Sequence, residues 1–306
     1  MSWLPCLEPD VHERGKAGPV DIVIEPVSKD LGGFSVRRAL PNIKRRTVGP
    51  FIFLDHMGPA ILPPGQGIDV RPHPHIGLAT LTYLTEGTLF HRDTLGTAQE
   101  ILPGAVNLMV AGRGIVHSER SSDAARGREE RSQGIQSWLG LPRNVEESDP
   151  GFIHMPVANL PFIEDAGVSL RLIMGSLFNE TSPVPTLSVT VYADAAMDAA
   201  SAMPFPADYA ERAAYVVSGE VQIGGDVFGE QRLLVFRPGD EVTVRAVAPS
   251  RVLLLGGEPL DGERHLWWNF VSSSRDRIEA AKADWKAGRF GVVPGDEAEF
   301  IPLPAI

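Results

Sequence analysis

Short alternating segments separated by glycine turns are the feature that most constrains the fold of this chain. Between Val20 and Leu141, apolar and polar residues alternate in several runs. Glycines mark turns within this region at Gly87, Gly96, Gly104, Gly112 and Gly114. Alternation with a period of two gives a strand one buried face, and glycine supports the tight turns between strands. Since the chain also holds 31 glycines and 26 prolines, the sequence predicts β-sandwiches or β-barrels and argues against a helix bundle.

The second half of the chain repeats the plan of the first half. The stretch YVVSGEVQIGG (residues 215–225) follows the pattern of TYLTEGTLFHRD (82–93), and RPGDEVTV (237–244) echoes LPGAVNLM (102–109). A repeated plan of this kind indicates duplication of one β unit. The chain has 306 residues, which is enough for two such units, each with its own core.

The organisation along the chain follows from these two units. We expect an N-terminal domain over residues 1–145 and a second β domain over residues 169–257. Residues 146–168 show few periodic cues and are predicted to be a linker. The polar segment 118–134 is predicted to be an exposed loop, and residues 258–306 form a C-terminal tail.

One helix is predicted in this tail. Ser273 can act as its N-cap, and Gly288 is suited to ending it. Ile278, Ala281 and Trp285 would share one face of the helix. We therefore expect the helix to serve in packing across the domains.

The net charge excludes one class of partner. The formal charge is −11 at pH 7, and an acidic chain repels the phosphate backbone of nucleic acids. The densest basic stretch, from Arg37 to Arg46, is short and is interpreted as a solvated strand or loop. We expect no direct contact with nucleic acid.

The cysteine count and the apolar runs bear on the compartment. Cys6 is the only cysteine of the chain, so no disulfide can form within it, which agrees with a reducing cytoplasm. The apolar run at residues 3–7 is too short for a signal peptide. A membrane span needs about eighteen consecutive apolar residues. No run in the sequence approaches that length. These observations predict a cytoplasmic protein without a membrane segment.

Two pairs of residues predict a metal site. His73 and His75 stand two residues apart at the start of an alternating run, and His117 and Glu119 have the same spacing after a glycine-rich turn. Side chains at positions i and i+2 of a strand lie on the same face. If both strands line one barrel, three imidazoles and one carboxylate converge. That set suits Fe, Mn, Ni, Co, Cu or Zn, with positions left for water or substrate.

The remaining histidines carry weaker signals. The second β unit contains none, so only the first unit could hold a histidine-based metal site. His56 is interpreted as a structural residue or as one lying behind the metal ligands. His91 is interpreted either as a pocket residue or as a solvent-facing one. No role is predicted for His12, His154 and His265.

These motifs make the chain resemble the cupins and, more narrowly, the pirin family of bicupins. The resemblance rests on FLDHMGP, RPHPHIGLATLTYL, AGRGIVHSE and the tail from residue 256 onward, and it covers nearly the whole chain. A cupin places a glutamate near Ala79 or Thr80, where this chain has none. In the pirin pattern, the carboxylate comes instead from the position of Glu119.

The resemblance implies a fold, a cofactor and a ligand set. The fold would be all-β, with two facing cupin barrels and a short C-terminal helix. One divalent metal, Fe(II) before the others, would be held in the N-terminal barrel by His73, His75, His117 and Glu119. The C-terminal barrel would hold no metal, and the tail would pack back across the N-terminal barrel.

The resemblance also implies two functions. The first is a quercetin 2,3-dioxygenase, an enzyme that opens a flavonol ring with O₂, in which Glu119 would accept the proton of the flavonol hydroxyl. The second is an iron-dependent, redox-sensing regulator that binds a transcription factor or a metabolic enzyme. A third possibility is a cupin acting on another small molecule. Candidates for the pocket lining, or for ordinary barrel core, are Phe53, Leu81, Tyr83, Met109 and Ile115.

Overall fold

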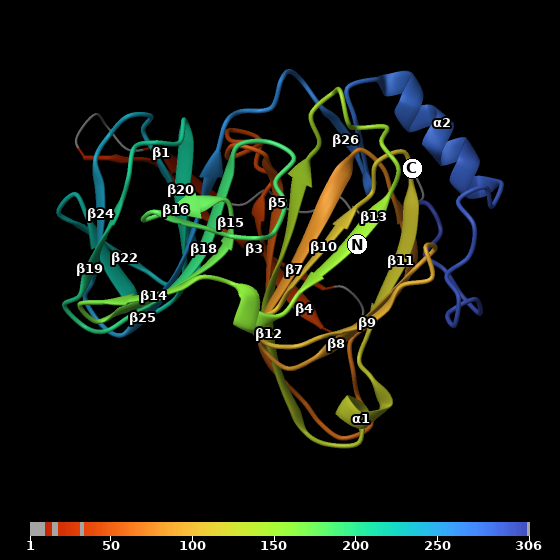
Figure 1. Ribbon diagram of the computed structural model, residues 1–306, viewed down its shortest axis with the longest axis horizontal. Coiled ribbons are helices and arrows are strands. Elements are labelled where there is room, and N and C mark those ends of the chain that lie inside the picture. The colour runs from red at the N-terminus through yellow and green to blue at the C-terminus, as the bar shows by residue number, and fades with distance from the viewer. Residues whose placement is uncertain (1–9, 14–17, 31–33, 305–306) are drawn as a thin grey trace.

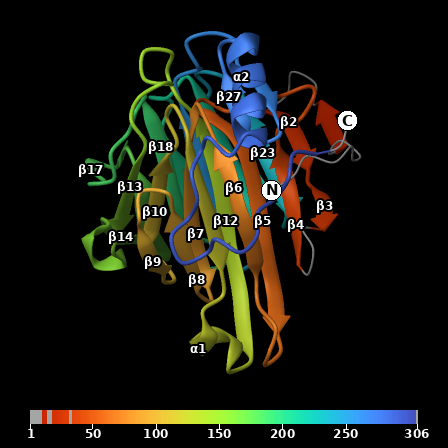
Figure 2. The same ribbon diagram turned by 90° about the vertical axis from the view of Figure 1, so that its right-hand side faces the viewer.

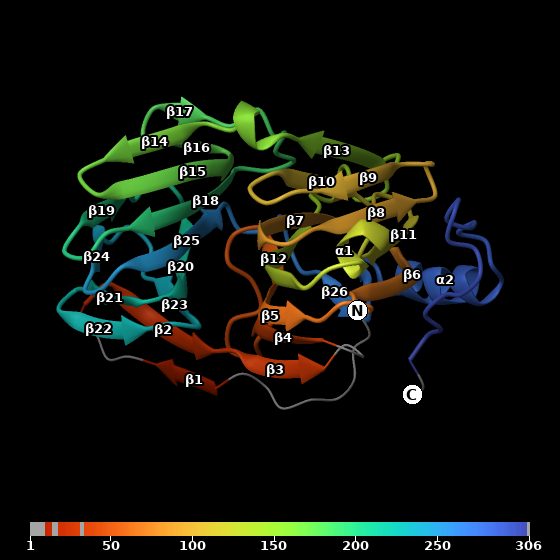
Figure 3. The ribbon, with the colours of Figure 1, turned by 90° about the horizontal axis from the view of Figure 1, so that it is seen from below.

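The computed structural model describes residues 10–13, 18–30 and 34–304, and it shows two β-barrels side by side (Figures 1 and 3). Each barrel consists of a large sheet packed against a smaller one. The only long helix among the described residues lies near the C-terminus. The predicted fold, two cupin-type barrels with a short C-terminal helix, is confirmed.

The N-terminal barrel combines a seven-stranded and a four-stranded sheet. In order across the large sheet, the strands are β13 (Gly151–Met155), β10 (Val106–Val110), β7 (Leu78–Glu86), β12 (Glu130–Gly140), β5 (Phe51–Leu62), β4 (Ser35–Leu40) and β3 (Val27–Asp30). The small sheet contains β6 (Asp69–His75), β11 (Ile115–Arg120), β8 (Leu89–Asp93) and β9 (Ala98–Ile101). All of the pairings are antiparallel.

The C-terminal barrel repeats this plan. Its large sheet contains β1 (Asp10–Glu13), β2 (Val20–Glu25), β23 (Arg232–Phe236), β20 (Glu211–Ser218), β25 (Ser250–Gly257), β18 (Thr190–Met197), β15 (Val168–Met174) and β14 (Phe162–Asp165). Its small sheet contains β19 (Ala202–Phe205), β24 (Val242–Ala246), β21 (Glu220–Ile223) and β22 (Asp226–Gly229). A two-stranded ribbon, β16 (Ser176–Leu177) and β17 (Glu180–Thr181), is added. The strand orders of the two barrels correspond, which supports the predicted duplication.

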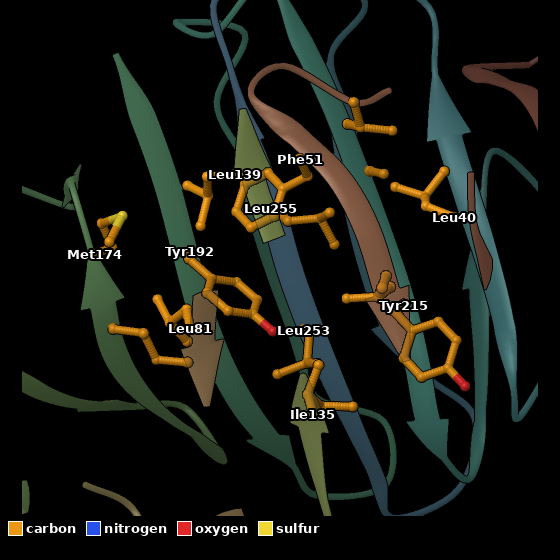
Figure 4. Packing of buried hydrophobic residues seen from close by; sticks show 14 of the residues in the cluster. Leu40, Phe51, Leu81, Ile135, Leu139, Met174, Tyr192, Tyr215, Leu253 and Leu255 are labelled. Atoms are coloured by element: carbon orange, nitrogen blue, oxygen red, sulfur yellow. The ribbon is translucent and has the colours of Figure 1, made fainter. Parts of the chain in front are cut away.

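The two large sheets face each other across a shared apolar layer (Figure 4). Leu81 and Ile135 of the first barrel pack in one cluster with Leu253 and Leu255 of the second. Tyr83 extends this contact with a hydrogen bond from its hydroxyl to Asp194 Oδ2 at 2.7 Å. Because the interface is built from the outer faces of the large sheets, each barrel keeps a separate interior.

The chain crosses between the barrels at two places that the sequence did not reveal. β1 and β2, which lie within the predicted N-terminal domain 1–145, pair with each other and through β2 with β23 at the edge of the C-terminal sheet. The predicted linker 146–168 contains a short 3₁₀ helix (Val157–Asn159) and two strands. Of these strands, β13 pairs with β10 and β14 pairs with β15. The linker prediction is therefore corrected, because the segment completes an edge of each barrel.

The predicted loop 118–134 is also largely regular. Its first residues belong to β11, and its last five residues belong to β12. Between them lies the single-turn helix α1 (Asp123–Arg126), which Ser122 caps through its side chain. Polar composition hid these strands, because some of their charged residues, such as Glu119 and Glu130, are buried and accept hydrogen bonds.

The C-terminal tail packs against the N-terminal barrel (Figure 2). Its elements are β26 (His265–Trp267), β27 (Phe270–Ser272) and α2 (Arg275–Lys286). Ile278 and Ala281 of α2 are buried, in a cluster that includes Ile76 of the barrel. The N-cap is Ser274, one residue after the predicted Ser273, because Ser273 donates its hydroxyl to Glu146 instead. Neither of the described α-helices is long and apolar enough to cross a membrane.

Candidate metal centre

The pairing of β6 with β11 builds the candidate site. His73 lies directly opposite His117 in this ladder, and His75 lies opposite Ile115. β6 is the edge strand of its sheet, so Pro74 removes no hydrogen bond from a central ladder. A register shift between His117 and Glu119 changes the local pairing. The ladder thus joins an edge strand and an inner strand that lie about forty residues apart in the sequence.

Three imidazoles meet inside the N-terminal barrel. His73, His75 and His117 are 3%, 1% and 1% exposed, and each offers a ring nitrogen within 4.8 Å of the others. The Nε2 atoms of His75 and His117 are 3.1 Å apart. Two imidazole nitrogens that bind one ion at bonds of about 2.1 Å lie about 3.0 to 3.4 Å apart. The observed spacing therefore fits a shared transition-metal ion.

The protonation of these rings also suits metal binding. Burial lowers the pKa of His73, His75 and His117 well below the usual histidine value. All three are therefore neutral at pH 7, which is the form that binds metals. His73 Nδ1 lies 2.8 Å from the carbonyl of Arg71 and donates to it. Its Nε2 thus carries the free lone pair.

Glu119 lies beside the histidines, in a second group. Its carboxylate is within 4.8 Å of ligand atoms of His91 and His117, and the residue is 6% exposed. The hydroxyl of Thr82 lies 2.9 Å from Glu119 Oε1 and 2.8 Å from Gln136 Oε1. Burial raises the pKa of Glu119, which makes this carboxylate a better proton acceptor than an exposed one. The assignment of Glu119 as a fourth ligand and proton acceptor stays a prediction.

The aromatic wall of the site includes a residue that the sequence did not single out. Trp138 of β12 meets the ring of His75 edge-on, at 5.1 Å between centroids, and stacks on Phe53 at 4.0 Å. Met109 and Ile115 belong to the same buried cluster. Trp138 follows Gln136 by two residues, so the alternation of β12 places both side chains on the inner face.

Two of the predicted lining residues lie elsewhere. Leu81 and Tyr83 belong to the apolar layer between the barrels, and not to the interior of the first barrel. Thr82, the residue between them on β7, contacts Glu119. Since side chains alternate along a strand, Leu81 and Tyr83 must point to the opposite face.

The structure gives His91 and His56 different roles. His91 is 2% exposed and lies in the site, against the solvent-facing alternative. His56 binds the hydroxyl of Tyr215 through Nδ1 and the amide of Gln133 through Nε2, so its role is structural. Burial, with a smaller contribution from the charge of Arg37, lowers the pKa of His56 from 6.5 to about 4.

His154 and His265 lie outside the site and have no assigned role in it. His154 Nδ1 lies 2.6 Å from Asn107 Oδ1 on the neighbouring strand. His265 is half-buried on β26. The side chain of His12 lies outside the described side chains.

Comparison with known proteins agrees with this geometry. The Pirin family model matches residues 33–139, and the model of the pirin C-terminal cupin domain matches residues 192–291. A pirin-like protein of Caulobacter vibrioides is 50% identical over 288 residues, which are 93% of this chain and 99% of the relative. The chain belongs to the pirin family.

Two further similar proteins carry names that refer to an activity. A Pseudomonas aeruginosa protein, provisionally named a quercetin 2,3-dioxygenase, is 38% identical over 90% of this chain and 87% of its own. A crystal structure described as quercetin 2,3-dioxygenase from Acinetobacter baumannii superposes with a TM-score of 0.86 at 34% identity. The alignment covers 93% of this chain and 95% of that one.

Two threonines of β7 lie at or next to the place of the missing cupin glutamate. Thr80 is 2% exposed on β7, at the place where the first cupin motif would supply a carboxylate. On the same inner face, Thr82 donates to Glu119. A hydroxyl on β7 thus supports a carboxylate that β11 provides.

Proposed function

We propose that this pirin is a metal-dependent dioxygenase of the quercetin 2,3-dioxygenase type, which opens a flavonol with O₂. The observation that carries the proposal is the buried group of three neutral imidazoles with Glu119 beside it. The similarity to the Acinetobacter baumannii protein supports the reaction type.

We propose His73, His75, His117 and Glu119 as the ligands of one divalent ion, with Fe(II) as the first candidate. Nitrogen donors with one carboxylate accept most of the first transition row, so Mn, Ni, Co, Cu and Zn remain alternatives. When bound, such an ion supplies Lewis acidity that lowers the pKa of a hydroxyl on the substrate, and redox chemistry toward O₂.

The chain's own residues would handle the proton and the solvent. Glu119 Oε would accept the proton of the flavonol hydroxyl, because burial raises the pKa of this carboxyl. The Thr82 hydroxyl would hold the carboxylate in place. Trp138 and Phe152 would shield the histidines from water, since their rings lie against His75 and His91.

Anaerobic reconstitution tests this proposal. The protein is loaded with each of Fe(II), Mn, Ni, Co and Cu, quercetin is added, O₂ is admitted, and the loss of quercetin absorbance is followed together with O₂ uptake. We expect turnover with at least one metal. Absence of turnover with all five would contradict the proposal.

The role of Glu119 has its own test. We expect Glu119→Gln to lower kcat per bound metal by about 10²- to 10⁴-fold, since an amide cannot accept the proton. Glu130→Gln is the matched control, because Glu130 is also a buried carboxylate but binds Thr88 at the far end of β12. Full activity of Glu119→Gln at equal metal content would exclude Glu119 as the proton acceptor.

The regulator interpretation stays a prediction, as does the cytoplasmic location. A pull-down that compares ferrous and ferric protein separates a redox switch from an enzyme. Identical sets of captured proteins would contradict the switch.

A further inference from the structure

The two ring nitrogens of His117 face two different neighbours. Nε2 lies 3.1 Å from His75 Nε2, inside the group of three histidines. Nδ1 lies 3.4 Å from His91 Nδ1, on the other side of the ring. An ion held through Nε2 of His117 therefore leaves Nδ1 free for a hydrogen bond to His91.

His91 continues into a buried carboxylate. Its Nε2 lies 3.0 Å from Asp93 Oδ2, and the two residues are 2% and 0% exposed. The ring of His91 stacks on Phe152 at 4.5 Å, with an interplanar angle of 22°. Asp93, His91 and His117 thus form a continuous chain of polar contacts across β8 and β11.

The carboxylate sets the direction of these hydrogen bonds. Asp93 Oδ1 accepts the backbone N–H groups of Leu95 and Thr97, at 2.9 and 3.1 Å. Burial opposes the charge of Asp93, but the bonds from His91 and Thr97 outweigh it and hold its pKa below the usual value. Asp93 is therefore ionised at neutral pH and can only accept, so the hydrogen of His91 lies on Nε2.

The same reasoning extends to the metal ligand. A neutral imidazole with its hydrogen on Nε2 has its lone pair on Nδ1. In this neutral form, His91 Nδ1 accepts from His117 Nδ1–H, and the lone pair of His117 then lies on Nε2. That atom is the one that faces His75.

We propose that Asp93 is a positioning residue that acts through His91 to fix the tautomer of His117, so that His117 Nε2 is presented to the metal. The inference rests on the metal centre of the proposed function. It extends the common pairing of a ligating histidine with a carboxylate by one further imidazole. The sequence shows this as a second alternating pair, His91 and Asp93, in the strand beside VHSE.

Asp93→Asn would reverse the chain of hydrogen bonds while keeping the shape of the side chain. Its oxygen can still accept from Leu95 and Thr97, which leaves the amide NH₂ facing His91 Nε2. His91 would then carry its hydrogen on Nδ1 and donate to His117. The hydrogen of His117 would move to Nε2 and oppose metal binding.

Two measurements test this proposal. The first is ¹⁵N NMR of the metal-free protein, which distinguishes protonated from unprotonated ring nitrogens. We expect the hydrogen of His117 on Nδ1 in the wild type and on Nε2 in Asp93→Asn. A hydrogen on Nε2 in the wild type, or an unchanged tautomer in the variant, would overturn the proposal.

The second measurement is the affinity for Co(II) in competition with a chelator. We expect Asp93→Asn to weaken binding by about 10- to 100-fold. In the background of His91→Phe, which retains an aromatic ring against Phe152, the same substitution should have no further effect. An equal loss in both backgrounds would show that Asp93 acts only on structure. Binding of two Co(II) ions per wild-type chain would also overturn the proposal, because the second ion would occupy His91.

Asp194→Asn is the matched control for placing an amide at a buried carboxylate. Asp194 is 5% exposed and binds Tyr83 and Arg251 at the face of the second barrel. We expect its Co(II) affinity to equal that of the wild type. The NMR experiment needs neither metal nor substrate, so failure of flavonol turnover and failure of this inference are distinguishable.

Discussion

The two barrels share one strand order but fill their interiors differently. In the first barrel, β6 and β11 bring His73 opposite His117. In the second, β19 and β24 form the corresponding ladder, and Phe205 lies opposite Val242. Phe205 and Val242 belong to a buried apolar cluster of the second barrel. The barrel therefore serves as a scaffold, and a few inward-facing residues decide whether it carries polar chemistry.

The polar interior has an energetic cost that the apolar interior avoids. A buried polar group without a partner costs about 1–3 kcal/mol. In the first barrel, hydrogen bonds such as those from Thr82 to Glu119 and from His91 to Asp93 offset part of this cost. In the second barrel, by contrast, the hydrogen bonds beside Phe205 run from the buried Arg212 to backbone carbonyls, including that of Phe205 itself. We therefore expect a carboxyl introduced into the second barrel to lower its stability. Removal of the Glu119 carboxyl from the first barrel should change stability little.

The largest effect should follow from placing a carboxyl in the second barrel. Val244 of β24 is 0% exposed within the apolar cluster. We expect Val244→Glu to lower the free energy of unfolding by about 3 kcal/mol or more, since the new carboxyl would have no prepared partner. Thr243→Glu, on the exposed face of the same strand, is the control and should change stability by less than about 0.5 kcal/mol. Denaturant unfolding measures the stability of both variants. Equal stabilities would contradict an apolar interior of the second barrel that cannot accept a carboxyl.

A second effect, of about 3 kcal/mol, concerns the contact between the barrels. His56, whose pKa is lowered to about 4, binds Tyr215 across the interface. The unfolded chain takes up this proton near pH 6.5, before the folded protein does, so stability is present above pH 6.5 and is lost as the pH falls toward 4. The loss for a shift of this size is about 3 kcal/mol.

The difference between wild type and His56→Gln isolates this contribution from other titrating groups. Denaturant unfolding at a series of pH values should show a wild-type curve that falls more steeply between pH 6.5 and pH 4. Parallel curves for the two proteins would contradict the assignment.

The smallest effect on stability should follow from the reverse exchange in the first barrel. In the metal-free protein, Glu119→Val leaves Thr82 able to donate to Gln136. We expect the free energy of unfolding to change by less than about 1 kcal/mol, while metal affinity falls at least about tenfold. A loss of several kcal/mol without metal would show that Glu119 is structural.

The sequence predicted the barrels and most of the site because both depend on local patterns. Period-two alternation and the repeated turn motifs indicated the strands, and the spacing of His73, His75 and His117 placed three imidazoles on inner faces. The pairing of β2 with the sheet of the second barrel was not predictable in this way, because its partner β23 lies about two hundred residues away in the sequence.

Face assignments were harder where both faces of a strand are buried. On β7, Leu81 and Thr82 are both buried, so hydrophobicity alone could not say which of them faces the metal site. His91 was ambiguous for the same reason. Only the pairing of β8 with β11 brings it next to His117.

Metal analysis of the purified protein measures directly how many metal ions each chain binds. We predict about one transition-metal ion per chain, because among the described residues the histidine clusters lie in one barrel and not in the other. Replacing both His73 and His75 with Ala should abolish this binding, whereas His265→Ala should leave it unchanged. Two ions per wild-type chain, or one ion retained by the double variant, would contradict a single metal site built on His73 and His75.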